Sequence, residues 1–343
     1  MEIAFAANNG DIGGGEVMLL ALAKEASTLG HEVCVVGPRN PDSLVDTAQD
    51  HGFRTVKLRS KNRLDYMNSL RQWWRKQPSG ILWCNGLLPA VATAGMKHRI
   101  VHLHQVPSAK LRNFLPLATL NSRRTIVPSN YVAQRIGTSS LVMPNWSYPN
   151  GIAAPMHDSV ECRIGFIGRF SSDKGLPTLI RATNQAQLLT KRNLKLVLAG
   201  EPRFVGAADQ QRVQDAIGNS SIPIEHVGWV DPSVFFSAVD LVVVPSNQPE
   251  SFGLVAAEAM SARVLLIVTD AGALPETVGK GHPLIAPAGD YGALAEMIAA
   301  AISIPSVEKK AIAEAAFKRW QTFYSPAAGR QRLENLLNSL ERV

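Results

Sequence analysis

The stretch PESFGLVAAEAM, residues 249–260, places two carboxylates, Glu250 and Glu258, among apolar and small side chains with seven residues between them. A helix over LVAAEAM is apolar on every side, so we expect it to be buried. A buried ionised Glu is costly unless something pairs with it. Glu258 therefore predicts a partner, which is either a core Arg or Lys or a ligand with two hydroxyl donors, such as a ribose diol.

The start of this helix is predicted at Ser251, because Ser is a favoured N-cap residue. The next three amides would then be free donors at the mouth of the helix, those of Phe252, Gly253 and Leu254. Glu258 would lie roughly two turns further in, about 9 Å along the axis. Glu250, in the loop just before the helix, is expected to face a sugar, and the alternative is a solvated loop acid.

Apolar, strand-like runs alternate with helical patterns through most of the chain, as in IAFAA (3–7), RIGFIG (163–168) and DLVVVPS (240–246). This alternation is typical of parallel sheets with crossover helices. Strands that are apolar throughout, rather than at alternate positions, are covered on both faces. The sequence therefore predicts an α/β protein with doubly wound sheets.

A domain boundary is predicted in the stretch 144–159, which is rich in Pro, Gly and Asn and has no periodicity. We expect one doubly wound domain over residues 1–155 and a second over residues 156–325. A C-terminal helix over residues 326–343 should pack back toward the N-terminal domain.

A glycine-rich turn follows the first strand and opens a helix, with Gly13, Gly14 and Gly15 in a row. Ligands of doubly wound sheets bind at the carboxyl ends of the strands, and glycines let backbone amides approach an anion there. A dinucleotide fingerprint would need its third glycine at Met18, and a P-loop would need a Gly-Lys-Ser/Thr ending. The turn therefore predicts a different phosphate contact, and the alternative is a turn that is merely tight.

Two cations follow the strand at 163–168, Arg169 directly and Lys174 five residues later. Either alone would be an ordinary surface charge. Together, at the carboxyl end of a strand in a domain without net positive charge, they predict a pyrophosphate clamp.

Two histidines of the first domain, His102 and His104, lie on the same face of a strand. Only His104 is close enough to the end of the strand to reach a ligand, so we expect it in the active site. A lone strand histidine is more often structural, and His102 is expected to be so.

The positive charge is concentrated in the N-terminal half. The 343 residues carry a net charge of +7, and residues 1–155 hold 17 Lys and Arg against 9 Asp and Glu. Between His51 and His157 the only acid is Asp65, against 15 Lys and Arg. Such a face is far from a mixed solvated surface and predicts an anionic partner.

The segment LRQWWRKQ, residues 70–77, adds Trp73 and Trp74 to this basic half. Tryptophans beside Arg and Lys are typical of a surface helix at an anionic lipid interface, so we predict peripheral attachment to the inner face of a membrane. The alternatives are that the Lys and Arg side chains only aid solubility, or that their partner is a soluble anionic sugar.

A cytoplasmic location is expected, because no segment is apolar for long enough to span a bilayer and the N-terminus lacks a secretory leader pattern. The cysteines are few and far apart and fit neither a disulfide framework nor a zinc site: Cys34, Cys84 and Cys162.

Taken in order, these motifs resemble the signature of retaining, nucleotide-sugar-dependent glycosyltransferases of family 4, which have the GT-B fold. The matching motifs are GGGE, STLGHEV, GRFSSDKG, LAGE, HVGWV, DLVVVPS and PESFGLVAAEAM. The resemblance runs nearly unbroken from Cys162 to Met297; in the N-terminal half it covers the first 40 residues, HLHQ, VPSNYVAQRI and VMPN. It implies two facing Rossmann-like domains with a deep interdomain cleft, the N-terminal one on the acceptor side and the C-terminal one binding the nucleotide sugar.

The resemblance also implies roles for the matching residues. The catalytic residues would be His104, Arg169, Lys174 and Glu250, with the two cations neutralising the diphosphate. The donor-binding residues would be Gly13, Gly14, Gly15, Gly200, Gly228, Trp229, Val230, Ser251, Phe252, Gly253, Leu254 and Glu258. Among these, Glu258 would hold the ribose, and the backbone of residues 228–230 would hold the base.

Two departures from the family pattern concern the acceptor side and the interdomain link. Gln105 stands where many relatives carry Asp after the histidine, and Trp146 follows Asn145 where Gly is usual. These two departures affect the prediction of the acceptor more than the prediction of the nucleotide-sugar donor.

We therefore expect a hexosyltransferase-type enzyme that moves a sugar, with retention of configuration, from a UDP- or GDP-sugar to a glycan or lipid-linked acceptor in bacterial cell-surface polysaccharide or glycolipid synthesis. We expect no role for nucleic acid. No metal or other cofactor is required, because fixed cations and a helix terminus would stabilise the leaving diphosphate and the chain lacks an Asp-x-Asp motif. The alternatives are a non-hydrolysing sugar-nucleotide epimerase and an inactive GT-B scaffold.

Overall fold

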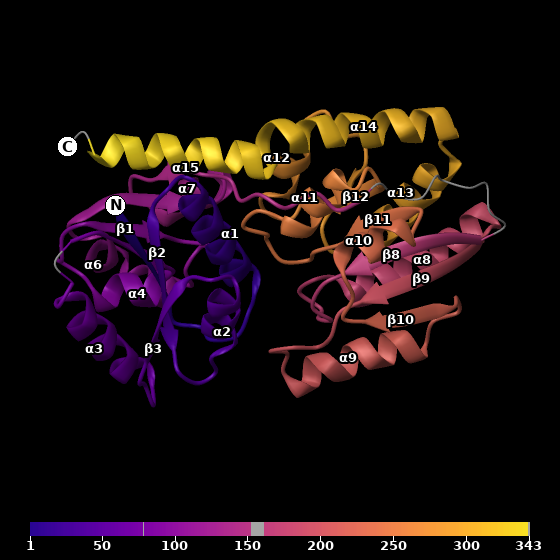
Figure 1. Cartoon of the computed structure of the whole chain (residues 1–343). Coiled ribbons are helices and arrows are strands. Elements are labelled where there is room, and N and C mark those ends of the chain that lie inside the picture. Colours follow the sequence, from indigo (N-terminus) through magenta and orange to yellow (C-terminus); the bar gives the residue numbers. More distant parts are fainter. Residues whose placement is uncertain (78, 152–160, 342–343) are drawn as a thin grey trace. The chain divides into compact units, whose positions relative to one another are not determined.

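The computed structural model describes residues 1–77, 79–151 and 161–341. The chain folds into two compact units (Figure 1). Unit 1 comprises residues 1–145 and 326–343, and unit 2 comprises residues 146–325. The first break thus comes at residue 145 rather than 155, and residue 155 itself lies outside the described residues.

The earlier break has a packing reason. Trp146 is 2% exposed, and the next residue, Ser147, bonds to the C-terminal part of unit 2. Its amide donates to the carbonyl of Tyr324 at 3.0 Å, and its hydroxyl accepts from the Trp320 indole at 2.9 Å. The Pro and Asn content of the sequence indicates a boundary here but not its position. The contacts of Ser147 with Tyr324 and Trp320 place the boundary before residue 146.

Unit 1 is built on a parallel sheet of seven strands in the order β3-β2-β1-β4-β5-β6-β7. The strands are β1 (Glu2–Ala7), β2 (Glu32–Pro38), β3 (Arg54–Leu58), β4 (Ile81–Asn85), β5 (Arg99–His102), β6 (Ser122–Val127) and β7 (Leu141–Val142). Because all pairs are parallel, the carboxyl ends of the strands lie at one edge of the sheet, and the loops that follow them are neighbours.

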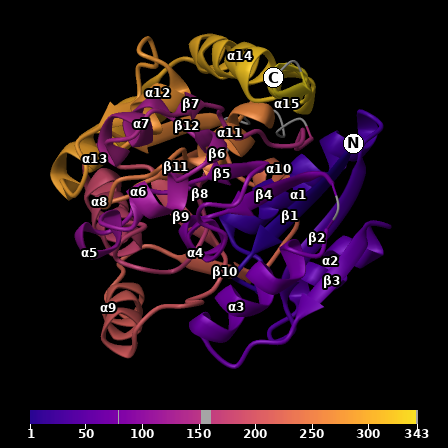
Figure 2. The same ribbon diagram turned by 90° about the vertical axis from the view of Figure 1, so that its left-hand side faces the viewer.

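The helices of unit 1 are α1 (Gly14–Thr28), α2 (Ser43–Asp50), α3 (Arg63–Trp74), α4 (Leu87–Ala92), α5 (Ala109–Arg112), α6 (Leu115–Thr119), α7 (Asn130–Ile136) and α15 (Pro326–Glu341). Figure 2 shows α2, β2 and β3 side by side at one edge of the unit. The C-terminal helix α15 packs on α1, where the Arg330 guanidinium lies 2.6 Å from the buried carboxylate of Glu25. Residues 326–341 therefore belong with the N-terminal part of the chain.

The tryptophan pair of α3 is not an exposed face. Tyr66, Leu70 and Trp74 recur at four-residue spacing and are buried in the core of unit 1, and Trp73 packs partly against it. Arg71 donates to the carbonyls of Ala92 and Ala94, at 3.1 and 3.0 Å. The expectation that this segment forms a membrane-facing surface was wrong, because helical spacing turns its aromatic side toward the sheet.

Unit 2 has a parallel sheet of six strands in the order β10-β9-β8-β11-β12-β13. The strands are β8 (Glu161–Ile167), β9 (Asn193–Ala199), β10 (Ile224–Gly228), β11 (Leu241–Val244), β12 (Leu265–Thr269) and β13 (Ile285–Ala286). The helices are α8 (Leu176–Thr190), α9 (Ala207–Gly218), α10 (Pro232–Ser237), α11 (Leu254–Ser261), α12 (Leu274–Val278), α13 (Tyr291–Ser303) and α14 (Ser306–Phe323).

Both faces of this sheet are covered by a hydrophobic core. Along β9, Leu196 and Leu198 pack with α8, α9 and α13, whereas Val197 and Ala199 pack with α10, α11, α12 and α14. Two parallel-sheet α/β units confirm the predicted fold class. Within the described part of the chain, no helix combines the length and the apolarity needed to cross a bilayer.

Candidate functional site

Three glycines join the carboxyl ends of neighbouring strands in unit 2. The Gly168 amide donates to the Ala199 carbonyl at 3.0 Å, and the Gly200 amide donates to the Gly228 carbonyl at 2.8 Å. Gly200 has φ +127°, and a Cβ at this position would lie 2.0 Å from the Gly168 carbonyl oxygen. Only glycine fits there, and the close approach holds the loops after β8, β9 and β10 together.

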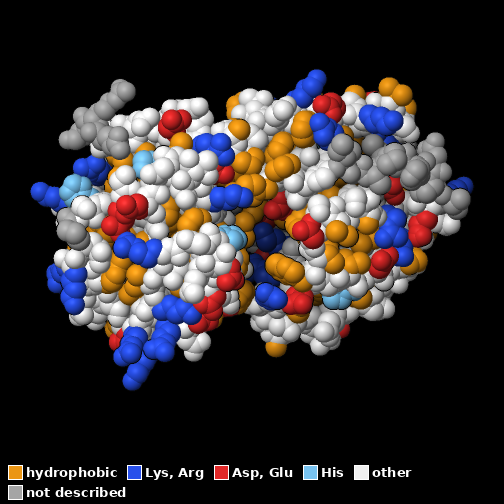
Figure 3. All heavy atoms as spheres, in the orientation of Figure 1, with side chains coloured by type: hydrophobic (Ala, Val, Ile, Leu, Met, Phe, Trp, Pro, Cys, Tyr) orange, Lys and Arg blue, Asp and Glu red, His pale blue; other side chains and the backbone are white. Residues whose placement is uncertain are grey.

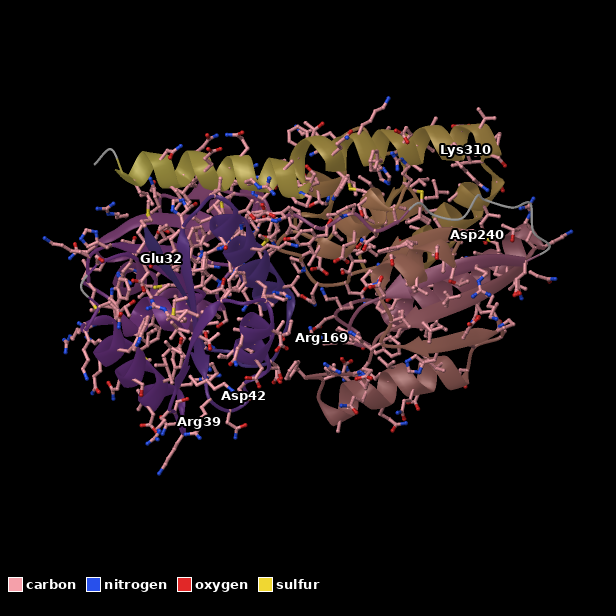
Figure 4. All side chains as sticks on the ribbon, in the orientation of Figure 1. Glu32, Arg39, Asp42, Arg169, Asp240 and Lys310 are labelled. Carbon is pink, nitrogen blue, oxygen red and sulfur yellow. The ribbon has the colours of Figure 1, made fainter. Side chains whose placement is uncertain are left out.

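Arg169 follows Gly168 directly and is exposed. In Figure 4 its side chain extends from the loop after β8. It makes no ion pair with any residue that the structure describes. A guanidinium without a protein partner at a strand end is free to bind an anion.

Lys174 and Glu250 are brought together from distant parts of unit 2. Lys174 precedes α8, Glu250 precedes α11, and the Lys174 Nζ lies 2.6 Å from the Glu250 Oε1. The two side chains are 36% and 17% exposed, so the pair is accessible without being fully solvated. The alternative of a solvated loop acid for Glu250 is therefore wrong.

The backbone and carboxylate of Glu250 are both anchored. Ser246, two residues after β11, donates its hydroxyl to the Glu250 Oε1 at 2.6 Å. The Glu250 carbonyl accepts from the Ala273 amide at 2.8 Å, and Gly272, at φ +66°, lets this loop approach. Ser246 was missed from the sequence, although its place directly after DLVVVP was a signal.

The helix after Glu250 begins later than predicted. Its N-cap is Gly253 at φ +94°, and α11 starts at Leu254, so Ser251 does not cap it. The reason is packing, because a Cβ on Gly253 would lie 2.4 Å from the Leu274 side chain. The amides of Phe252, Gly253 and Leu254 still donate to no backbone carbonyl of the described residues.

Glu258, one turn into α11, has no side-chain partner among the described residues, so the alternative of an ion pair with a core Arg or Lys is absent there. Glu258 as a whole is half-buried, whereas its carboxyl group is almost completely surrounded by protein. Burial raises the pKa of Glu258 to about 7. A ligand is then the remaining candidate for its partner.

An exposed aromatic side chain lies beside the strand ends. Trp229, which follows Gly228, is 71% exposed, and the Arg203 guanidinium lies over its ring at 4.9 Å from the centroid. Val230 comes next and packs partly on the core of unit 2. The loop therefore presents backbone groups and a flat apolar surface together.

In unit 1 the glycine turn caps α1. Gly13 is the N-cap, and its amide donates to the Glu16 Oε2 at 3.1 Å, so this amide is already used. Burial raises the pKa of Glu16. A Cβ on Gly14 would meet open space, whereas a Cβ on Gly15 would lie 3.4 Å from the His104 ring. The position open to an anion is therefore Gly14.

His104 is held in one tautomer by Asn85. The Asn85 side-chain amide donates to the Gly15 carbonyl at 3.2 Å, so its Oδ1 must accept from the His104 Nε2, 2.6 Å away. The His104 Nδ1 is then an acceptor, and this buried atom has no hydrogen-bond partner among the residues that the structure describes. Burial lowers the pKa of His104 to about 4, which leaves the ring neutral at neutral pH. Asn85 was missed from the sequence, although it ends the strand ILWCN.

His102 lies behind this group as a buried strand residue. It is 0% exposed and accepts from the Trp83 indole at 3.3 Å. Its ring centroid lies 4.1 Å from that of His104. The buried position of His102 agrees with the structural role that the sequence predicts for it.

Two models of known protein families match this chain, one in its N-terminal part and one in its C-terminal part. Residues 12–144 match the family model described as Glycosyltransferase Family 4, and residues 156–319 match the one described as Glycosyl transferases group 1. Together these matches span most of both units.

Two similar curated proteins are bacterial. A lipopolysaccharide 1,2-N-acetylglucosaminetransferase of Salmonella typhimurium is 28% identical over 53% of this chain and 51% of that protein. The capsular polysaccharide biosynthesis glycosyltransferase CapM of Staphylococcus aureus is 28% identical over 51% of this chain and 46% of that protein. This chain thus aligns with about half the length of these relatives.

Similar solved structures cover the whole chain. HepE of Anabaena in complex with UDP and glucose has a TM-score of 0.84 at 20% identity, over 99% of this chain and 100% of that one. A sucrose-phosphate synthase of Thermosynechococcus elongatus has a TM-score of 0.81 at 19% identity, over 99% of both chains. At these identities the likeness shows the fold.

Proposed function

Because the chain belongs to the family 4 glycosyltransferases with the GT-B fold, we propose that it transfers a sugar from a nucleoside-diphosphate sugar to a glycan or lipid-linked acceptor with retention of configuration. The observation that carries the proposal is the edge of unit 2, where Arg169 and the Lys174–Glu250 pair follow parallel strands. Glu258, which has no side-chain partner among the described residues, lies in the helix that follows Glu250. This set supplies two cations that can bind a diphosphate and a carboxylate that can accept hydrogen bonds from the hydroxyls of a ribose.

UDP is the first nucleotide to test, and GDP the second. HepE, which shares the fold, was solved with UDP-glucose. In our proposal the base lies along residues 228–230, the ribose hydroxyls donate to Glu258, and the diphosphate meets Arg169 and Lys174. Unit 2 then binds the donor, and unit 1 binds the acceptor.

The reaction breaks the bond between the anomeric carbon and the diphosphate oxygen and forms one to an acceptor hydroxyl oxygen, whose proton passes to the departing diphosphate. Negative charge grows on the leaving diphosphate, and Arg169 and Lys174 stabilise it together with the amides before α11. Retention without a covalent nucleophile requires attack from the face of departure. In our proposal the His104 ring, neutral at neutral pH, lies beside the transferred sugar.

The proposal is tested by incubating a panel of nucleotide sugars with and without candidate acceptors. A glycosyltransferase releases nucleoside diphosphate in step with transfer to an acceptor. An epimerase would convert the nucleotide sugar without any acceptor, and an inactive scaffold would bind no donor. Either of the last two results would contradict the proposal.

Glu258→Gln should have opposite effects on nucleotide binding and on stability. It should weaken UDP binding by about 1 to 3 kcal/mol, because charge-assisted hydrogen bonds to the ribose are lost. In the wild type, UDP binding should strengthen as the pH rises through about 7, where Glu258 ionises, and the variant should lose this dependence.

The stability effect follows from the same pKa. A carboxyl whose folded-state pKa is raised from 4.5 to about 7 favours folding below pH 4.5, and this contribution is lost as the pH rises toward about 7. Above that range Gln removes the cost of a buried charge, so the unliganded variant should melt at a higher temperature than the wild type. Unchanged UDP affinity in a folded variant would refute the role of Glu258.

Activity should not need a divalent metal, because fixed cations and a helix terminus neutralise the leaving group. Transfer should continue in EDTA at a rate within about twofold of the untreated enzyme, since a lost Lewis acid would cost several kcal/mol. Activity that disappears in EDTA and returns with manganese or magnesium would contradict this.

Membrane attachment, if the acceptor is lipid-linked, needs a different surface from α3. We place it on the α5–α6 patch, defined as Leu111, Phe114, Leu117 and Leu120, which are 44–50% exposed. Lys110, Arg112 and Arg124 lie beside these residues in the sequence and are exposed. Exposed apolar side chains among cations suit an anionic lipid interface.

Vesicle sedimentation tests this patch. Binding should need anionic lipid, fall as salt rises from about 50 to 500 mM, and drop about tenfold or more in Phe114→Ser/Leu117→Ser through lost apolar burial. Leu188→Ser, at a 79% exposed position of unit 2, is the matched control and should bind as the wild type does. Equal recovery with neutral and anionic vesicles would end the membrane proposal.

A further inference from the structure

Unit 1 contains a polar pocket that is distinct from the candidate site. It lies where β2 and β3 end, has a volume of about 510 Å³, and is lined by Arg39, Arg59, Lys61, Asp65, Ser69 and Gln72 among others. Arg39 directly follows β2, Arg59 directly follows β3, and Ser69 and Gln72 come from α3. A volume of this size is within the range of small-molecule sites.

The charge of the pocket is positive and largely uncompensated. Arg39, Arg59 and Lys61 form no ion pair with the described residues. Figure 3 shows Lys and Arg side chains gathered at the lower end of unit 1, where Figure 4 labels Arg39. Three cationic side chains therefore line the same pocket.

The nearby acids offset only part of this charge, because Asp42, which also attracts Arg39, shares a single lysine with Asp46. Asp42 and Asp46 both bind Lys57, at 2.8 and 2.6 Å. Asp65 lines the pocket, and one of its oxygens accepts from the Lys61 amide at 3.3 Å. One acid against three cations leaves a net attraction for an anion.

The walls of the pocket are fixed by backbone contacts. The Arg39 amide donates to the Leu58 carbonyl at 2.9 Å, and the Ser69 hydroxyl donates to the Arg59 carbonyl at 2.9 Å. The Gly10 carbonyl accepts from the Leu44 amide at 2.8 Å, which ties the loop after β1 to the start of α2. These contacts fix the backbone from which Arg39 and Arg59 extend, so a ligand has to order only their side chains.

The position of the pocket links it to the acceptor side. β1 lies between β2 and β4 in the sheet, so the pocket is on the same edge as the glycine turn and His104. Two guanidinium groups and an ammonium match the oxygens of a phosphate ester, which Arg binds through paired donors.

We propose that this pocket binds the phosphate group of a phosphorylated acceptor, either a soluble sugar phosphate or a phosphate-bearing lipid headgroup. That the ligand is the acceptor rests on the proposed function; that the pocket binds phosphate does not. The pocket is separate from the donor residues, all of its lining residues being in unit 1.

Calorimetry on the full chain tests the pocket, with inorganic phosphate and glucose 6-phosphate as probes and UDP present in excess to fill the donor site. Arg39→Ser/Arg59→Ser should weaken binding of both probes by about tenfold or more, because two charge-assisted contacts are lost. Lys76→Ser/Lys97→Ser removes the same charge from exposed positions just after α3 and just before β5, at the opposite edge of the sheet, and should leave binding unchanged.

Unaltered probe binding in Arg39→Ser/Arg59→Ser would overturn the proposal, as would an equal loss in the control variant, which would indicate diffuse attraction. Failure of UDP to bind any variant would instead count against the proposed function and leave the phosphate result standing. UDP affinity, titrated separately, should be the same in the pocket variant and the wild type.

Vesicles of phosphatidylcholine with phosphatidic acid distinguish the two sources of phosphate. Loss of vesicle binding in Arg39→Ser/Arg59→Ser would assign the site to a lipid headgroup. Unchanged vesicle binding, with glucose 6-phosphate bound more tightly than inorganic phosphate, would assign it to a soluble sugar phosphate.

Discussion

Replacing Lys174 with alanine should lower kcat for sugar transfer about 100- to 1,000-fold, the range for losing one preorganised group that stabilises developing charge. Lys174 is 2.6 Å from Glu250 in the unliganded protein, so its ammonium is already positioned at the donor edge of unit 2. Diphosphate charge grows as the bond to the sugar breaks, so the interaction is stronger in the transition state than with bound donor.

Arg169→Ala should behave in the same way, because its guanidinium is exposed and unpaired among the described residues. Arg212→Ala is the charge-matched control, since this α9 side chain is 69% exposed and should not affect transfer. Steady-state kinetics with varied donor separates the cases. A rise in KM with kcat unchanged would reassign both cations to uniform binding of donor and transition state.

The second large effect is expected on stability. Arg99→Met should lower the free energy of unfolding of unit 1 by about 3 to 5 kcal/mol, as expected when several buried acceptors lose their donor. Arg99 is 0% exposed, and its guanidinium donates to the carbonyls of Ala90, Met96 and Leu120, at 2.9, 3.0 and 2.5 Å. It also donates to the Ala118 carbonyl, and so joins α4, α6 and the start of β5.

Denaturant unfolding of the variant, followed by the transition of unit 1, measures this effect. Arg99→Lys should recover little of the loss, because an ammonium cannot reach the same acceptors as a planar fork. Arg75→Met, at the exposed end of α3, is the control and should change stability by less than about 0.5 kcal/mol. A loss below about 1 kcal/mol in Arg99→Met would show that the carbonyls find other donors.

The parts of the site that the sequence predicts are those fixed by topology. Parallel strands end at one edge, so residues directly after apolar strands, such as Arg169 and Gly200, are predicted to lie together from the order of the strands alone. Glu258 could be identified as unusual because a carboxylate in an all-apolar helix conflicts with its surroundings. These inferences need only strand direction and burial.

What the sequence does not predict depends on contacts between distant residues. Gly253 rather than Ser251 caps α11 because Leu274 lies against the helix start. Trp74 is buried because its side of α3 faces the sheet. Ser246 matters only because the fold brings it to Glu250. Local propensity contains none of these distances.

The central claim, that the edge of unit 2 binds a nucleoside diphosphate, is tested most directly by calorimetric titration of UDP and GDP into the full chain without added metal. We expect saturable binding of at least one of them, weakened in Glu258→Gln and in Arg169→Ala and unchanged in Arg212→Ala. Absence of binding by both nucleotides to the folded wild-type protein would contradict the account.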